Sequence, residues 1–139
     1  MTAKNKGRII RIVGSVIDIR FEGELPSLYN AIEVPFGEEI IVLEVVQHLG
    51  DNTVRCISMH STDGLKRGME AIDTGAPISV PVGEKVLGRM VNVLGQPIDN
   101  MPAIEAKERW SIHRKPPSLT EQVAQPEMLE TGIKAIDLL

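Results

Sequence analysis

The strongest constraint on the fold is the regular alternation of short β-branched runs with turns containing glycine or proline in the first eighty residues. Residues 17–21 alternate apolar and charged side chains, which is the period of a half-buried strand. Gly14 precedes this run, and Pro26, Gly37 and Gly50 fall between the later runs. Turns spaced at about 8–12 residues are typical of small all-β folds.

We expect strands at residues 7–13, 16–21, 31–34, 40–46, 53–59 and 78–83, and one strand-like run at 86–95. The run 40–46 is apolar on both faces except at Glu44, as in a strand buried on two sides. Pro81 marks the run 78–83 as an edge strand or a domain exit. Closure of such strands removes exposed sheet edges, so the sequence predicts a mainly β fold with a small closed or nearly closed antiparallel barrel.

The remainder of the chain has a different pattern. Residues 100–127 are charged and interrupted by proline, and we expect this stretch to wrap over a larger body of protein or to hang loose where that body has been cut away. Thr131 is a suitable helix N-cap before an apolar stripe of Ile133, Ile136 and Leu139. Because no helix stop signal follows, we expect the chain to be a fragment that ends within a helix.

Composition argues against several classes of function. The formal net charge is −4 and only 3% of the residues are aromatic, which disfavours a nucleic-acid surface. Cys56 is the one cysteine, so it indicates a reducing compartment and inert packing in the core. No apolar run approaches the ~20 residues of a membrane span. The first residues lack a signal-peptide core, so we expect no export.

The sequence offers no motif for nucleotide or metal chemistry. A P-loop requires Gly-Lys within its signature, and no Gly-Lys dipeptide occurs in these 139 residues. The Gly-x-Gly-x-x-Gly fingerprint is also absent. His48, His60 and His113 are far apart, and one cysteine gives no zinc-binding spacing. We therefore assign no catalytic, cofactor-binding or metal-binding residue.

Single residues that suggest chemistry have plainer explanations. His48 follows a buried type of strand, so we expect it to be structural. His113 lies in a basic segment, and we expect it to face solvent or a partner surface. A triad of Ser58, His60 and Asp63 lacks the glycines of a nucleophile elbow, so we do not expect it to form.

The chain resembles the β subunits of F1 ATP synthases, within the family of rotary-ATPase catalytic and regulatory subunits. The matching segments lie, in order, at 7–21, 47–50, 54–59, 62–68, 73–78, 80–83, 87–89, 92–99, 108–110, 112–114 and 130–139. Gln-His-Leu-Gly at 47–50 and Ile-His-Arg at 112–114 favour β over the similar α subunit. Cys56 and Ser58 stand where we would expect threonine and alanine, a mild departure on a core strand.

The resemblance implies a six-stranded antiparallel closed barrel over residues 1–80. It also implies that residues 81–139 are the incomplete start of an α/β P-loop nucleotide-binding domain. The intact subunit would bind ATP or ADP with magnesium and act in a proton-translocating ATP synthase. The family's catalytic residues would lie beyond Leu139, so we expect this chain to hold no cofactor and to have no activity.

The resemblance also implies partners and a location. The partners would be F1 α subunits in an alternating α3β3 ring and a central stalk subunit, with neither nucleic acid nor direct membrane insertion. The location would be the bacterial cytoplasm, peripheral on the inner face of the plasma membrane.

For the ring contact we expect two barrel loops, residues 63–68 with Lys66 and Arg67, and residues 23–28, because they combine charge with turn chemistry. Two alternatives stay open. One is the barrel of a related rotary or export ATPase subunit, and the other is an OB-like binding module.

Overall fold

The computed structural model describes residues 5–122, 125 and 127–138. Its elements are β1 (Lys6–Val13), β2 (Val16–Phe21), β3 (Asn30–Phe36), β4 (Glu39–Gly50), β5 (Thr53–Ser58), β6 (Glu70–Pro77), β7 (Ser79–Val82), η1 (Glu84–Val86), β8 (Glu108–Ser111) and α1 (Lys134–Asp137). Residues 1–4 lie outside this description, and they are part of the segment in which we expect no signal peptide. Leu139, a member of the expected apolar stripe, also lies outside it.

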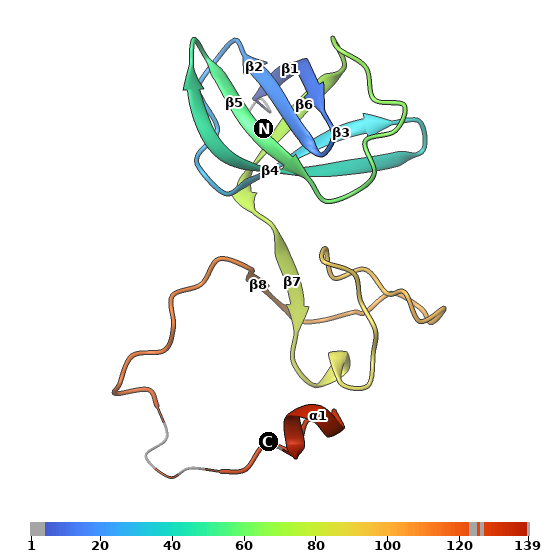
Figure 1. The fold of residues 1–139 in the computed structure, drawn as a ribbon, viewed down its shortest axis with the longest axis vertical. Coiled ribbons are helices and arrows are strands. Elements are labelled where there is room, and N and C mark those ends of the chain that lie inside the picture. Colours follow the sequence, from blue (N-terminus) through green and yellow to red (C-terminus); the bar gives the residue numbers. More distant parts are fainter. Residues whose placement is uncertain (1–4, 123–124, 126, 139) are drawn as a thin grey trace.

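Six strands form a closed antiparallel barrel in the order β1-β2-β5-β4-β3-β6 (Figure 1). The expected mainly β fold with a closed barrel is thus confirmed. Two predicted turns supply the backbone that the hairpins require. Gly14 joins β1 to β2 with φ of 57°, and Asp51 and Asn52 join β4 to β5 with φ of 47° and 54°.

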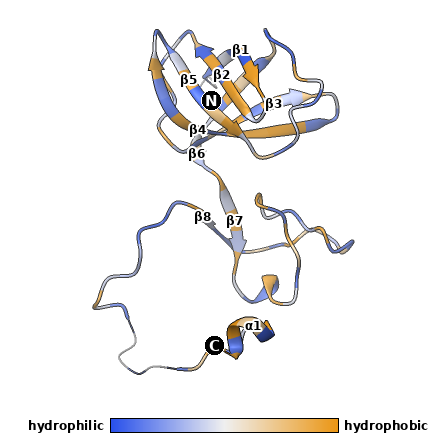
Figure 2. Ribbon diagram, viewed as in Figure 1, coloured by the Kyte–Doolittle hydropathy of each residue, from blue (hydrophilic) through white to orange (hydrophobic). Residues whose placement is uncertain are grey.

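The barrel interior is filled by aliphatic side chains. The alternation expected in β2 places Ile17 and Ile19 inside at 0% exposure and Phe21 at 1%. The other members of this core are Ile9, Ile32, Val34, Ile41, Leu43, Val45, Val54, Cys56 and Ala71. Hydrophobic residues are concentrated along the barrel strands in Figure 2.

The closing strand, β6, was not among the predicted strands. It pairs with both β1 and β3 and so completes the barrel. Its sequence contains Asp73, Thr74 and Gly75, and of its residues only Ala71 is buried. Backbone pairing with two neighbours, rather than an apolar pattern, holds this segment in the sheet.

Below the barrel, β7 and β8 form a separate two-stranded antiparallel sheet (Figure 1). The strand expected at 78–83 is confirmed as β7. β8 lies within the stretch 100–127, where the sequence pattern predicted no strand. Pairing with β7 supplies the backbone partners that the sequence pattern does not reveal.

The prediction of a strand-like run at residues 86–95 was wrong. It is replaced by η1, turns and an isolated bridge between Val91 and Pro97. Gly88 adopts φ of 70°, which interrupts an extended strand. The Asn92 side chain accepts hydrogen bonds from the backbone N–H groups of Leu94 and Gln96, so a local turn takes the place of sheet pairing.

The end of the described chain forms one helical turn, α1. Its N-cap is Ile133, so the prediction of Thr131 at that position was wrong. The Thr131 hydroxyl donates to Asp137 Oδ1 at 2.6 Å, and no side chain caps the start of the helix. Ile136 is 58% exposed. Within the described ranges, no helix is long and apolar enough to cross a bilayer.

Candidate interaction surface

The residues considered for a serine triad do not form one. The Ser58 hydroxyl bonds to the backbone of His60, at 2.9 Å from its carbonyl oxygen and 3.2 Å from its nitrogen. The His60 ring accepts a 3.4 Å bond from the Val42 N–H. Asp63 accepts a hydrogen bond from Ser61 instead of orienting the imidazole. Each of the three residues thus makes other contacts in the structure.

His48 has a structural contact, as predicted. Its Nε2 lies 2.7 Å from the carbonyl oxygen of Pro26. Pro26 is fully buried, so the bond fixes the loop 23–28 against the end of β4. This ring therefore secures one of the two loops expected to contact a partner.

His113 is exposed, as expected, but its ring also contacts the barrel, which was not predicted. Its Nε2 lies 2.7 Å from Glu44 Oε2 on β4, and its ring stacks on Tyr29 with centroids 4.2 Å apart. These contacts tie the segment after β8 to the outer wall of the barrel. The one sequence signal was Glu44, the single polar residue in an otherwise apolar run.

A charged pair spans the barrel wall between β2 and β5. Arg55 donates to both carboxylate oxygens of Asp18, at 2.8 and 3.0 Å, and the two residues are direct cross-strand partners. The hydrogen bonds from Arg55 lower the pKa of Asp18, burial opposes this, and the charges of Arg55 and Arg11 add to the lowering. Each side chain of the pair thus has a hydrogen-bonded partner of opposite charge, and the pair stabilises the barrel wall.

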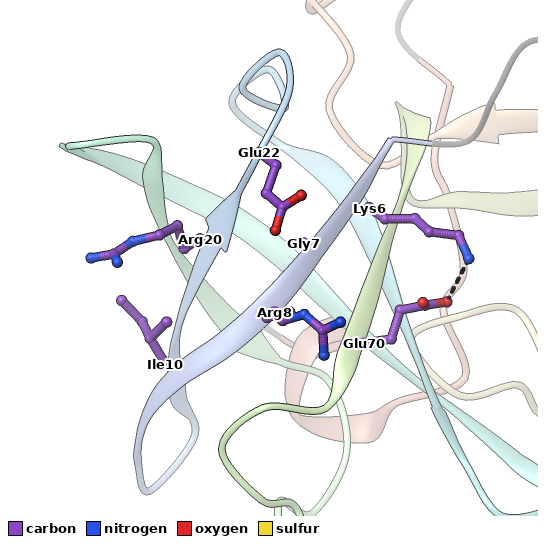
Figure 3. A pocket seen from close by; sticks show the side chains of 7 residues that line it. All are labelled: Lys6, Gly7, Arg8, Ile10, Arg20, Glu22 and Glu70. Atoms are coloured by element: carbon purple, nitrogen blue, oxygen red, sulfur yellow. Dashed lines mark ion pairs between the residues drawn. The ribbon is translucent and has the colours of Figure 1, made fainter.

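The outer face of β1 and β2 carries a shallow depression with mixed charge (Figure 3). Its lining residues are Lys6, Gly7, Arg8, Ile10, Arg20, Glu22 and Glu70. Lys6 and Glu70 form an ion pair at 3.0 Å. Arg8 and Arg20 are direct cross-strand partners, so two like charges face the same side of the sheet.

Residues 9–75 match the family model described as the ATP synthase alpha/beta family, beta-barrel domain. The match begins in β1 and ends in β6, and therefore takes in all six strands of the closed barrel. Residues 9–75 are a barrel domain of the ATP synthase alpha/beta family. This family supplies subunits that assemble into hexamers with related ATPase subunits and are hydrolases in the intact complex.

The two expected contact loops lie near opposite ends of the barrel strands. The loop 63–68 is held by Thr62, whose hydroxyl donates to the Gly14 carbonyl at 2.9 Å. Lys66 and Arg67 on this loop are exposed, and neither forms an ion pair with a residue in the described part of the chain. Both are thus available to a partner.

Outside the ATP synthase barrel, Arg89 and Asp99 close the loop between η1 and β8. The guanidinium donates to both carboxylate oxygens, at 2.6 and 3.1 Å. Arg89, together with the backbone N–H groups of Met101 and Met90, holds the pKa of Asp99 well below its usual range. This pair was not among the predicted sites; its partners are ten residues apart, and only Arg89 lies in the run 86–95 that we expected to be strand-like.

The described residues do not fit a bound magnesium ion or nucleotide. They contain no cluster of three or more acidic, histidine or cysteine side chains arranged to hold a metal. Every buried side-chain nitrogen or oxygen among them has a hydrogen-bond partner.

Proposed function

We propose that the chain belongs to the catalytic β subunit of an F1-type ATP synthase, and that its barrel joins that subunit into the ring. The observation that carries the proposal is the closed six-stranded barrel, whose strands coincide with the matched residues 9–75. A closed barrel has no free edges and keeps its shape when neighbouring domains move. Such a unit suits a ring that anchors sites which open and close.

The β assignment is supported by two segments of the sequence. Gln-His-Leu-Gly at 47–50 contains His48, which bonds to Pro26, and Ile-His-Arg at 112–114 contains His113, which bonds to Glu44. Both histidines therefore serve contacts within this chain, so each segment has a structural reason to retain its histidine.

The proposed assembly follows the resemblance. The subunit alternates with α subunits in an α3β3 ring around a central stalk, peripheral to the inner face of a bacterial plasma membrane. The intact complex uses ATP, ADP and magnesium and couples their chemistry to proton transport. Residues 81–139 are the start of the nucleotide-binding domain in this proposal.

A binding experiment separates the subunit alternatives. We expect the chain, mixed with purified F1 α subunits or with F1 β subunits, to form a mixed complex with α that native mass spectrometry detects. Preferential binding to β would reverse the assignment. Binding instead to the subunits of an export ATPase would favour the alternative of a related ATPase barrel.

Nucleotide binding is tested separately. Because these residues contain neither a P-loop nor a metal cluster, we expect titration calorimetry with Mg-ATP to show no stoichiometric site of micromolar affinity. Such a site would contradict this part of the proposal and leave the barrel assignment unaffected.

A further inference from the structure

A buried carboxylate on the barrel wall depends on a histidine from outside the barrel. The Glu44 side chain is 12% exposed, although Leu43 and Val45, its neighbours in β4, point inward and leave it on the outer face. The one side-chain hydrogen bond that Glu44 makes with the described residues goes to His113 Nε2, at 2.7 Å. Burial of a charged carboxylate is costly unless a hydrogen-bond donor or an opposite charge accompanies it. The charge of this one imidazole therefore decides how favourable the burial of Glu44 is.

Residues 112–114, which we call the strap, bring this imidazole to the barrel wall. The Ile112 N–H donates to the Ile78 carbonyl at 3.0 Å, next to β7, and His113 reaches Glu44 on β4. The strap thus crosses from the two-stranded sheet to the barrel. Docking of the strap covers Glu44, and its release would return the carboxylate to water.

The docking position of the strap includes a strained residue of the barrel. Tyr29 has φ of 69°, a left-handed backbone conformation that is unfavourable for a residue with a Cβ. Its N–H donates to the Val45 carbonyl at 2.8 Å, and its ring stacks on His113 with centroids 4.2 Å apart. Strained backbone of this kind persists where the surrounding contacts hold it, and it is frequent at switch regions. The tyrosine ring is thus held in place against the imidazole.

We propose that the strap is a pH-sensitive latch, which docks on the barrel more tightly when His113 carries its second ring proton. A histidine in an ordinary peptide gains that proton as the pH falls through about 6.5. Nε2 can donate to Glu44 in either state, but only the imidazolium places an opposite charge beside the buried carboxylate. Docking is therefore strongest in mildly acidic solution. It weakens as the pH rises above neutrality, and again below about pH 4, where carboxylates gain a proton.

The other charges around the pair limit what else could respond to pH. The residues paired with Glu44 across the sheet are Ala31 and Ile57, which are uncharged. The charged or titratable residues closest to the pair in sequence and strand register are Tyr29, Glu33, His48, Arg55, Arg114 and Lys115. Among these types, only histidine ordinarily changes its charge between pH 5.5 and 8. His48 is thus the one alternative in this set, and its ring bonds to the Pro26 carbonyl.

Amide hydrogen exchange at pH 5.5 and pH 8.0 tests the latch, with each rate divided by the intrinsic exchange rate at that pH. The His113 side chain is 38% exposed, so we expect a modest gain: protection of residues 108–114 about threefold higher at pH 5.5 than at pH 8.0. His113→Gln keeps a donor that does not titrate, and Glu44→Gln removes the carboxylate charge. In both variants, protection of this segment should be equal at the two pH values. His60→Gln is the matched control and should retain the gain, because its ring contacts Val42.

Three results would overturn the inference. The first is equal protection of residues 108–114 at the two pH values in the unaltered chain. The second is a gain that survives in His113→Gln, where His48 still titrates, and the third is a gain that survives in Glu44→Gln. Protection in β2 reports whether the barrel of each variant is folded, and His113→Gln lies outside the barrel, so it carries the test even if Glu44→Gln does not fold. The inference does not depend on which ATPase subunit contains the chain.

Discussion

Asp18 is a carboxylate on the outer wall of the barrel and is nevertheless only 4% exposed. Its neighbours in β2, Ile17 and Ile19, point inward, so Asp18 points outward and is covered by side chains on the same face. Arg55 lies directly across the strand pair and supplies two hydrogen bonds. The burial is tolerated because both carboxylate oxygens of Asp18 accept hydrogen bonds from Arg55.

Removing this charge should lower stability. The folded-state pKa of Asp18 is lowered, so its contribution is present above the ordinary carboxyl pKa and is lost as the pH falls through the lowered folded value. We expect Asp18→Asn to reduce the free energy of unfolding at pH 7 by about 1–2 kcal/mol in urea titrations. The difference from the unaltered chain should shrink as the solution becomes acidic.

Asp51→Asn is the matched control, because Asp51 is exposed in a turn that asparagine also accepts. Its unfolding free energy should stay close to that of the unaltered chain. An Asp18→Asn effect that does not change with pH would contradict the role of the ion pair.

The single thiol should be unreactive in the folded protein. Burial, together with the charges of Asp18 and Asp73, raises the pKa of Cys56 to about 12. We therefore expect iodoacetamide to label Cys56 slowly at pH 8 and at the rate of a free thiol once urea has unfolded the chain. Rapid labelling without denaturant, followed by mass spectrometry, would show that the core opens at β5.

At the scale of elements, the turns set the ends of the strands. Gly64 and Gly68 both have positive φ, at 85° and 88°, in the loop between β5 and β6. A Cβ at Gly64 would lie 2.8 Å from Phe36 Cζ, whereas a Cβ at Gly68 would meet no atom within 4 Å. A side chain at Gly68 would therefore meet backbone strain alone, whereas a side chain at Gly64 would meet backbone strain and overlap with Phe36.

Alanine at these positions should have unequal effects. Gly68→Ala should destabilise the chain by about 1–2 kcal/mol, the cost of a left-handed backbone for a residue with Cβ. Gly64→Ala should cost more, since the side chain of Phe36 must also move. Thermal unfolding followed by circular dichroism compares them directly, and equal midpoints would contradict the packing of this loop on Phe36.

The strands that could be predicted from sequence are those with an apolar period. β2 has Ile17, Ile19 and Phe21 at alternate positions, so its pattern alone defined its inner face. β6 has no such pattern, because barrel closure positions it through backbone pairing to β1 and β3. The run 86–95 has strand-forming residues, but glycines with positive φ and the Asn92 turn override them.

Contacts between distant segments could not be predicted in the same way. The partners His113 and Glu44 are 69 residues apart, and their approach depends on the route of the chain through β7 and β8. The absence of a P-loop, by contrast, required only the sequence. The sequence alone was therefore enough to exclude a P-loop within these residues, but it was not enough to predict the contact between His113 and Glu44.

For the whole molecule, the bond between His113 and Glu44 links the barrel to the sheet that follows it. We expect His113→Ala to increase amide hydrogen exchange in β8 and the residues after it, because the contacts with Glu44 and Tyr29 are lost. Exchange in β2, on the far side of the barrel, should not change. His60→Ala is a matched control, because its ring contacts Val42 rather than this segment.

We propose that residues 6–77 are a ring-forming barrel of the β type. A barrel exchange tests this proposal: these residues replace the barrel of an F1 β subunit and, separately, the barrel of an F1 α subunit, and the mass of each assembled complex is measured. We predict that the β replacement yields an α3β3 hexamer and that the α replacement does not. Two results would contradict the proposal: a hexamer that forms only with the α replacement, or no hexamer with either replacement.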